Sequence, residues 1–223
     1  MIQFDTSESQ ERERGLAAAT AALRRGQLVG LPLDTTYGVA VDAFAPGATR
    51  SLADAKGRAA LSVPVMVPRI ATVAGIAVVG DAAGRLMRDF WPGALTLVLP
   101  AQPTLAWSLT DAAGRVAVRM PLHPLALELL ERTGPLGVVA AAYTRDPSAP
   151  VSASASFPPA LAAHVAVLLD AGALPASPSS AVLDLTGAQP RLVRAGPLDV
   201  AELRACCPDL LVAPSAEPPA AAT

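Results

Sequence analysis

The sequence predicts an α/β fold in which helices pack on a mixed β-sheet. Apolar runs of about four or five residues, bounded by Pro, Gly and polar turns, are typical of buried strands. Longer segments with apolar side chains at helical spacing separate many of these runs. The two kinds of element do not alternate in a strict βαβ rhythm, and no internal repeat is present, so we expect both parallel and antiparallel strand pairs.

The helices are predicted from apolar spacing and from residues that begin or end a helix. Thr6 or Ser7 is expected to cap the first helix, and Gly26 to end it. Pro124 suits the first position of a later helix, which Gly134 would end. The buried face of the first helix would be Leu16, Ala19, Ala22 and Leu23. In chain order the predicted helices are 10–25, 48–55, 81–90, 125–132 and 199–205, with a short helix or irregular segment at 72–79 and a short helix or turn at 160–163.

The strands are predicted from short runs rich in Val, Leu and Ala. Pro64 lies inside one run, which either weakens that strand or places it at an edge of the sheet, because proline cannot donate to a ladder. The run 95–99 is a clear buried strand. In chain order the predicted strands are 27–31, 39–42, 63–67, 95–99, 116–119, 136–142, 165–169, 181–185 and 191–194. Polar loops are expected at 42–47, 100–111 and 143–156.

The chain has 223 residues, of which 52% are hydrophobic and only 4% aromatic, so its core must consist mainly of Ala, Val and Leu. This length fits one large domain, which we expect over 1–212, followed by a disordered Pro/Ala-rich tail at 213–223. A net charge of −2 excludes a strongly basic nucleic-acid-binding protein but leaves room for a local basic groove.

Cysteine and histidine are too few for most metal sites. The only cysteines are the adjacent Cys206 and Cys207, and the only histidines are His123 and His164, so no metal site is predicted. The first 15 residues are polar and charged, and no apolar run reaches the roughly 18 residues of a membrane span. We therefore expect a soluble cytoplasmic protein without a signal peptide or a membrane contact.

Polar residues cluster directly after the first buried strand. Residues 34–38, DTTYG, carry an acid, two hydroxyls, a phenol and a glycine. Ligands of α/β proteins bind beyond strand ends of this kind. Lys56 and Arg58 follow near the end of the next helix and suggest an anionic substrate. The alternative is an ordinary turn followed by a solvated basic pair.

Six blocks, in order and at matching spacing, resemble the YrdC family of threonylcarbamoyl-AMP synthases. Each block alone is a weak signal, but together they extend from about Gly26 to Leu203, nearly the whole chain. The blocks are PLDTTYGV at 32–39, KGR at 56–58, WPGALTLVL at 91–99, VAVRMPLHP at 116–124, SSAVLD at 179–184 and RAG at 194–196.

The resemblance implies a twisted α/β sheet around a large electropositive cavity, and a nucleotidyltransferase activity. The family joins ATP, L-threonine and bicarbonate to give threonylcarbamoyl-AMP and pyrophosphate. A partner enzyme, a threonylcarbamoyl-transferase, then modifies adenosine 37 of tRNA, and the fold is also described as binding double-stranded RNA. ATP with Mg²⁺ would be substrate and counter-ion, with no tightly bound cofactor.

The resemblance also implies roles for individual residues, mainly cations that match phosphate and carboxylate oxygens. Each arginine could instead form a surface ion pair, while Trp91 is expected in the core and His123 in a structural role. The catalytic residues implied are Lys56, Arg58 and Arg119. The implied ATP-binding residues are Lys56, Arg58, Ser152 and Arg194. The implied threonine-binding residues are Thr35, Tyr37, Arg119 and Ser180.

The chain departs from the family pattern at several polar positions. Leu33 replaces a threonine that contacts substrate, Ala59 replaces a proline, and Pro68 replaces a frequent histidine. Residues 141–143, AAY, align with the family's Ser-Ala-Asn, so those contacts would come from elsewhere, for instance Tyr143, Thr144 or Ser152. Three functions stay open: the synthase, a related domain that binds nucleotide or RNA without turnover, and a carbamoyl-adenylate enzyme with another acceptor.

Overall fold

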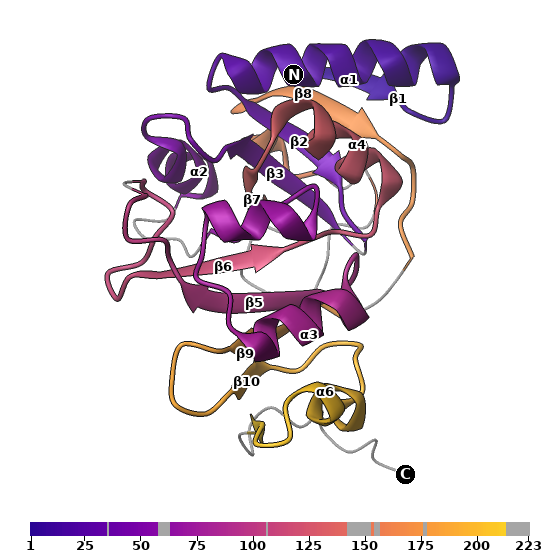
Figure 1. The fold of residues 1–223 in the computed structure, drawn as a ribbon. Coiled ribbons are helices and arrows are strands. Elements are labelled where there is room, and N and C mark those ends of the chain that lie inside the picture. The colour runs from indigo at the N-terminus through magenta and orange to yellow at the C-terminus, as the bar shows by residue number, and fades with distance from the viewer. Residues whose placement is uncertain are drawn as a thin grey trace.

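A computed structural model describes residues 1–34, 36–57, 63–105, 107–141, 153, 157–175 and 178–212 of the chain. Within these residues the strands form one mixed sheet, as predicted (Figure 1). The sheet contains both parallel pairs, such as β1–β8, and antiparallel pairs, such as β2–β3. In spatial order the strands are β1 (Ile2–Asp5), β8 (Val165–Asp170), β2 (Leu28–Pro32), β3 (Tyr37–Asp42), β7 (Leu136–Ala140), β4 (Val65–Met66), β6 (Arg115–Arg119), β5 (Leu95–Pro100), β9 (Ala181–Asp184), β10 (Arg191–Arg194) and β11 (Leu211–Val212).

The helices fall close to their predicted positions and pack on this sheet. Figure 1 shows α1 beside the β1–β8 end, α3 beside β5, and α6 near the C-terminal strands. The segment expected at 72–79 is a 3₁₀ helix that begins and ends earlier. The helices are α1 (Ser9–Arg24), α2 (Ala48–Lys56), η1 (Ile70–Gly75), α3 (Asp81–Phe90), α4 (Pro124–Thr133), α5 (Pro159–Ala162) and α6 (Val200–Cys206).

Two apolar clusters hold the fold together. The first lies under α1 and α4 and contains the predicted buried face of α1, since Leu16, Ala19, Ala22 and Leu23 are at most 1% exposed. The second joins α2, α3, α5 and α6 to the rest of the sheet, and it includes Trp91, which confirms the expected core role of that residue. Both clusters consist mainly of Ala, Val and Leu, as the composition predicts.

One sheet face is left partly open on the strands β6, β5 and β9. In β6 the side chains of Arg115 and Ala117 are partly exposed, whereas Val116 and Val118 are buried. Ala117 lies opposite Val98 of β5, and Val98 lies opposite Asp184 of β9. Because side chains alternate along strands, Arg119, Thr96 and Ser180 belong to this same face. The strand pairing therefore collects polar residues from three separate blocks on one surface.

Several local predictions are wrong. The residue before α1 is Glu8, without a side-chain cap; Thr6 and Ser7 instead bond to Asp170 and Asp5. Of the two alternatives given for the strand around Pro64, the edge position is wrong, because β4 lies between β7 and β6. The strand is instead short, with two residues that follow Pro64. The strands β1 and β11 were not predicted at all. The loop at 143–156, apart from residue 153, and the tail at 213–223 lie outside the described residues.

Candidate functional site

The turn between β2 and β3 carries the carboxylate at the centre of the site. Across this turn the Leu33 amide donates to the Thr36 carbonyl over 2.9 Å. The Asp34 side chain, about 10% exposed, points out of this turn. Its Oδ1 accepts from the backbone amides of Leu122 and His123 at 2.7 and 2.8 Å, and its Oδ2 pairs with Arg119. Asp34 thus ties the turn to the end of β6 and to the start of α4.

Arg119 is the last residue of β6 and is only 8% exposed. Its Nε donates to the Gly93 carbonyl at 2.9 Å, and its Nη2 donates to Asp34. Burial lowers the pKa of the guanidinium, and the Asp34 carboxylate opposes that shift. The group remains charged at neutral pH, because arginine does not deprotonate in proteins. Its Nη1 has no hydrogen-bond partner among the residues that the structure describes, which leaves that nitrogen available to an anion.

A second polar cluster lies across the same sheet face. Ser180, 7% exposed, shares a 3.0 Å hydrogen bond with the hydroxyl of Thr96. Arg194, at the end of β10, donates through Nε to the Ser180 carbonyl at 3.0 Å and through Nη2 to the Ser180 Oγ at 3.2 Å. Arg194 is exposed as a whole residue, yet partial burial of its guanidinium lowers its pKa. Ser180 and Arg194, which were predicted to bind threonine and ATP, are therefore hydrogen-bonded to each other.

The two arginines are close enough to interact electrostatically. The charge of Arg194 lowers the pKa of Arg119, which is the sign of repulsion between like charges. Each guanidinium is held by two hydrogen bonds from its Nε and Nη2 atoms. Two fixed cations on one sheet face form a site that favours an anion, and the planar guanidinium matches carboxylate and phosphate oxygens.

Lys56 lies at another edge of the site. It ends α2, where Gly57 takes the left-handed conformation with φ of 61°. The side chain is 7% exposed, and its Nζ donates to the Ala140 carbonyl at 2.9 Å. The next amide, that of Ala141, donates to the Tyr37 carbonyl at 2.8 Å. Lys56 is therefore linked to the β2–β3 turn through the end of β7, although no contact joins it to Arg119 within the described residues.

Tyr37 is fully buried, at 0% exposure. Its hydroxyl contacts the Gly172 carbonyl at 2.8 Å and Asp170 at 3.2 Å, and it accepts from the Ala171 amide at 2.9 Å. In this conformation the phenol holds the end of β8 and does not reach the open face. The remaining predicted site residues, Thr35, Arg58 and Ser152, lie outside the described residues, as do Ala59 and Tyr143.

A cavity of about 260 Å³ lies on the open face, further along β6 and β9. Its floor is apolar and includes Val98, Ala117 and Val182. At its rim, Arg115 pairs with Asp111 at 2.8 Å and with Asp184 at 3.4 Å. The sequence analysis missed these rim residues and the role of Asp34. The signal available was the alternation of residues 115, 117 and 119 along one strand.

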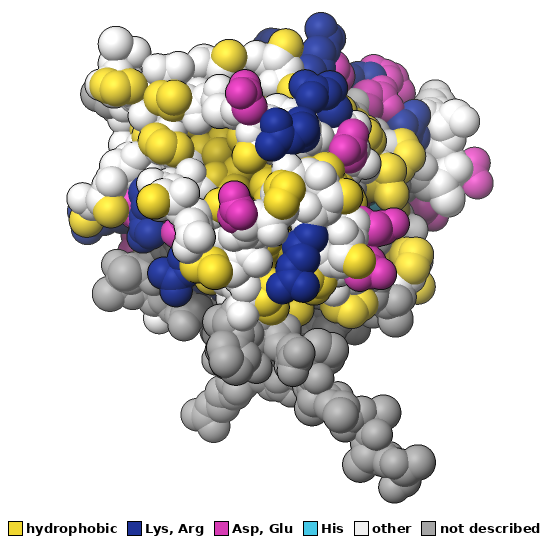
Figure 2. Space-filling model, turned by 60° about the horizontal axis from the view of Figure 1, so that its bottom comes forward, with side chains coloured by type: hydrophobic (Ala, Val, Ile, Leu, Met, Phe, Trp, Pro, Cys, Tyr) yellow, Lys and Arg dark blue, Asp and Glu magenta, His cyan; other side chains and the backbone are white. Residues whose placement is uncertain are grey.

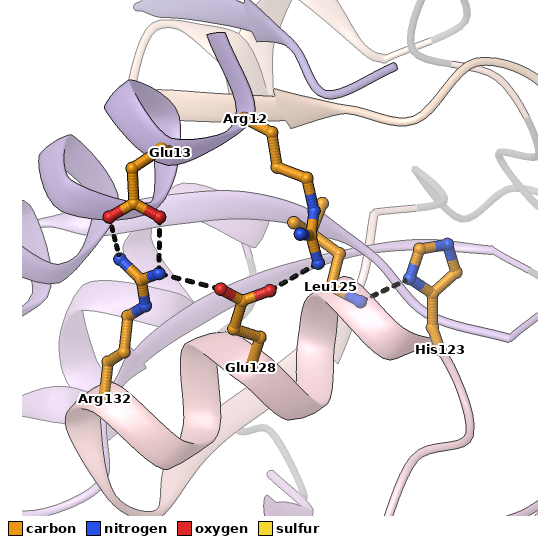
Figure 3. A network of polar contacts seen from close by, with 6 residues as sticks. All are labelled: Arg12, Glu13, His123, Leu125, Glu128 and Arg132. Carbon is orange, nitrogen blue, oxygen red and sulfur yellow. Dashed lines mark hydrogen bonds and ion pairs between the residues drawn. The ribbon is translucent and has the colours of Figure 1, made fainter. Parts of the chain in front are cut away.

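His123 has the structural role expected of it. Its Nδ1 accepts from the Leu125 amide at 3.3 Å and so caps α4. Figure 3 shows the network behind it, in which Arg12 and Arg132 join α1 to α4 through Glu13 and Glu128. By holding α4 against α1, this network also fixes the segment just before α4, whose Leu122 and His123 amides donate to Asp34.

Neither a metal site nor a membrane-spanning helix is found in the part of the chain that the structure describes. It contains no group of three or more His, Cys, Asp or Glu able to hold a metal ion. None of its helices combines the length and the apolarity that crossing a bilayer requires. On the face drawn in Figure 2, basic side chains form one group near the top of the view and are otherwise scattered among acidic and apolar ones.

Comparisons with known proteins show the family to which the chain belongs. The family profile Sua5/YciO/YrdC, described as "Telomere recombination", matches residues 21–196. A protein of Mycobacterium tuberculosis H37Rv, provisionally named a threonylcarbamoyl-AMP synthase, is 45% identical over 87% of this chain and 90% of its own. The Bacillus subtilis threonylcarbamoyl-AMP synthase is 36% identical over 90% of this chain and 58% of its own.

A solved structure gives the same answer for the fold. The crystal structure of Pyrococcus abyssi Sua5 complexed with L-threonine matches with a TM-score of 0.81 and 27% identity, over 96% of this chain and 62% of that one. The profile covers well over half of the chain, and the mycobacterial relative aligns over most of it. The chain therefore belongs to the Sua5/YciO/YrdC family.

Proposed function

We propose that this protein is a threonylcarbamoyl-AMP synthase that uses ATP, L-threonine and bicarbonate. The observation that carries the proposal is the pair of guanidinium groups of Arg119 and Arg194 on one sheet face, each fixed by two hydrogen bonds, with the Ser180 hydroxyl bonded to Arg194. The proposal is supported by relatives that bear this name. Two fixed cations suit a reaction whose substrates are a carboxylate and a triphosphate.

The proposed reaction has two bond-forming steps. The amine of threonine attacks bicarbonate, a C–N bond forms, water leaves, and a carbamate results. A carbamate oxygen then attacks the α-phosphorus of ATP; a P–O bond forms, the bond to the β-phosphate oxygen breaks, and pyrophosphate departs. Such a transfer needs positioning and charge stabilisation rather than a covalent intermediate on the protein.

We assign the predicted residues to these steps. Arg119 and Ser180, with Thr35 and Tyr37, belong to the threonine end, where Tyr37 would act by holding the turn. Arg194 and Ser152 belong to the nucleotide, and Lys56 and Arg58 to the triphosphate. Mg²⁺ would enter with the phosphates, which suits a site without a cluster of carboxylates among the described residues. Transfer to tRNA by a separate enzyme completes the proposal.

The test is pyrophosphate release by the purified protein with ATP, bicarbonate and Mg²⁺, with and without L-threonine. Lys56→Ala is expected to abolish threonine-dependent release. Arg50→Ala, in the same helix but with its side chain 87% exposed, is the matched control and should leave the rate unchanged. No release despite ATP binding would refute the synthase and favour a nucleotide or RNA binder. Release that does not depend on threonine would also refute the synthase, because ATP would then be cleaved without the amino-acid substrate.

A related enzyme with another acceptor is the second candidate, because Leu33 stands where the family has a substrate-contacting threonine. The same assay with serine, alanine and valine in place of threonine separates the two. A higher kcat/KM for one of these amino acids would favour the second candidate.

A further inference from the structure

Asp34 is the only residue in the described part of the chain whose side chain bonds to both Arg119 and the segment before α4. It comes from the β2–β3 turn, while Arg119 ends β6 and His123 precedes α4. Asp34 lies 85 residues before Arg119, whereas β6 and α4 follow one another in the chain, so this one carboxylate fixes the turn against the end of β6 and the start of α4. The mechanism proposed above uses Arg119 but assigns nothing to Asp34.

The geometry divides the carboxylate between two tasks. Oδ1 accepts two backbone amides at 2.7 and 2.8 Å, which fixes the orientation of the carboxylate plane. Oδ2 is then directed at Nη2 of Arg119. The Gly93 carbonyl holds Nε at 2.9 Å on another edge of the guanidinium. Because Nε and Nη2 are both held, the guanidinium plane cannot rotate, and the N–H bonds of Nη1 point in a fixed direction.

We propose that Asp34 is a positioning residue that fixes the guanidinium plane of Arg119, so that Nη1 meets the carboxylate or carbamate of the amino-acid substrate. This inference rests on the proposed function for the identity of that anion. Asp34 does not touch the reacting atoms and acts only through Arg119. A fixed guanidinium loses less conformational freedom on binding than a mobile one, which favours substrate affinity.

Asp34→Asn is the informative substitution because it keeps the shape of the side chain. The amide oxygen can still accept from the two backbone amides at positions 122 and 123. The amide nitrogen then faces Nη2 of Arg119, so that a donor meets a donor and the arginine turns away. Asp199→Asn is the matched control: Asp199 also accepts a backbone amide, that of Ala201 at 2.8 Å, but it caps α6.

The expected kinetic result is a selective loss on the amino-acid side. In the pyrophosphate assay Asp34→Asn should raise KM for threonine by about tenfold or more, with KM for ATP changed less than twofold. Asp199→Asn should change neither. An equal rise of both KM values, an unchanged KM for threonine, or tighter threonine binding would overturn the proposal.

A double-variant comparison tests whether Asp34 acts through Arg119. Asp34→Asn should cost little further activity in an Arg119→Gln background, whereas additive losses would contradict the inference. If Asp34→Asn alone does not fold, the double variant should fold, because it no longer contains an unpaired buried charge. Failure of the double variant to fold as well would also count against the coupling.

An activity-independent readout separates this inference from the proposed function. The Nε–H signal of Arg119 in an NMR spectrum, assigned with Arg119→Lys, should be sharp and protected in the wild type and lost or exchange-broadened in Asp34→Asn. That result would stand even if the wild type released no pyrophosphate, which would refute only the synthase proposal. An unchanged Arg119 signal in Asp34→Asn would overturn the positioning role.

Discussion

A methyl group at Gly196 would meet the backbone of the site directly. Gly196 follows β10 and lies against Ser180 and Ala181. A Cβ built there would be 2.2 Å from the Ala181 nitrogen and 2.8 Å from the Ser180 carbonyl carbon. Both atoms belong to the main chain and cannot turn aside as a side chain would. Gly196→Ala must therefore separate the two segments by about 1 Å or more, since overpacking is relieved by backbone shifts.

That displacement would break the contacts between Arg194 and Ser180. The Nε-to-carbonyl distance of 3.0 Å would lengthen beyond hydrogen-bond range. Loss of a hydrogen bond to a charged group costs about 1.5–3 kcal/mol, which corresponds to roughly 10- to 100-fold in KM for ATP if Arg194 binds the nucleotide. The overpacking itself costs about 1–3 kcal/mol of folding free energy. For a chain of this size that lowers Tm by roughly 2–12 °C.

Gly187→Ala, in the connection between β9 and β10, is the matched control. The nearest atom to its added Cβ would be 3.7 Å away, an ordinary contact. We expect that variant to keep the wild-type Tm and KM, measured by differential scanning fluorimetry and pyrophosphate release. A Gly196→Ala protein with wild-type Tm and wild-type KM for ATP would refute the argument that this close approach holds Arg194 in place.

Two further predictions concern titrating groups. Burial and the charge of Arg12 lower the pKa of His123, and the charge of Asp34 opposes that shift. The neutral imidazole that caps α4 should therefore contribute its full stability above about pH 6.5, and this contribution should decline as the pH falls below that value. Urea unfolding should therefore show the stability of the wild type relative to His123→Asn falling from pH 7.5 to 5, and a constant difference would contradict this. Burial, with Asp89 adding to the effect, raises the pKa of Cys206 to about 11, so alkylation of native protein at pH 8 should be at least about tenfold slower than in urea. Equal rates, measured by mass spectrometry, would show that the thiol is accessible.

The sequence predicts the elements of this fold well where apolar spacing is strong. All nine strands expected from short apolar runs are present, because each run places at least one side chain in one of the two cores. The strand Ile2–Asp5 was missed since it lies at the edge of the sheet and is largely exposed, so no buried pattern marks it. The strand Leu211–Val212 has only two residues, too few for any pattern. The α1 cap was mispredicted because Thr6 and Ser7 bond to the β1–β8 edge instead.

The sequence predicted which polar residues lie near one another better than it predicted their contacts. Arg119, Arg194 and Ser180 were selected from separate motifs, and the pairing of β6, β5, β9 and β10 collects them on one face. Tyr37 was selected for a ligand contact, yet its hydroxyl is used by the end of β8. No local pattern distinguishes a phenol that faces a cavity from one that faces a neighbouring strand. Such contacts depend on register between distant segments, which a single sequence does not contain.

The structure explains why leucine at position 33, where the family has a threonine, is compatible with this fold. Leu33 is 5% exposed and packs in the apolar cluster under α1 and α4, and its Cδ1 atom would lie 3.1 Å from a Cβ on Gly38. Its neighbour Asp34 points the other way, toward Arg119. The Leu33 side chain therefore anchors the turn in the apolar cluster, while the Asp34 carboxylate on the opposite side orients Arg119. Because the two neighbouring side chains point in opposite directions, the replacement of a hydroxyl at 33 leaves the Asp34–Arg119 pair intact. The same replacement adds buried apolar area beneath the turn that carries that pair.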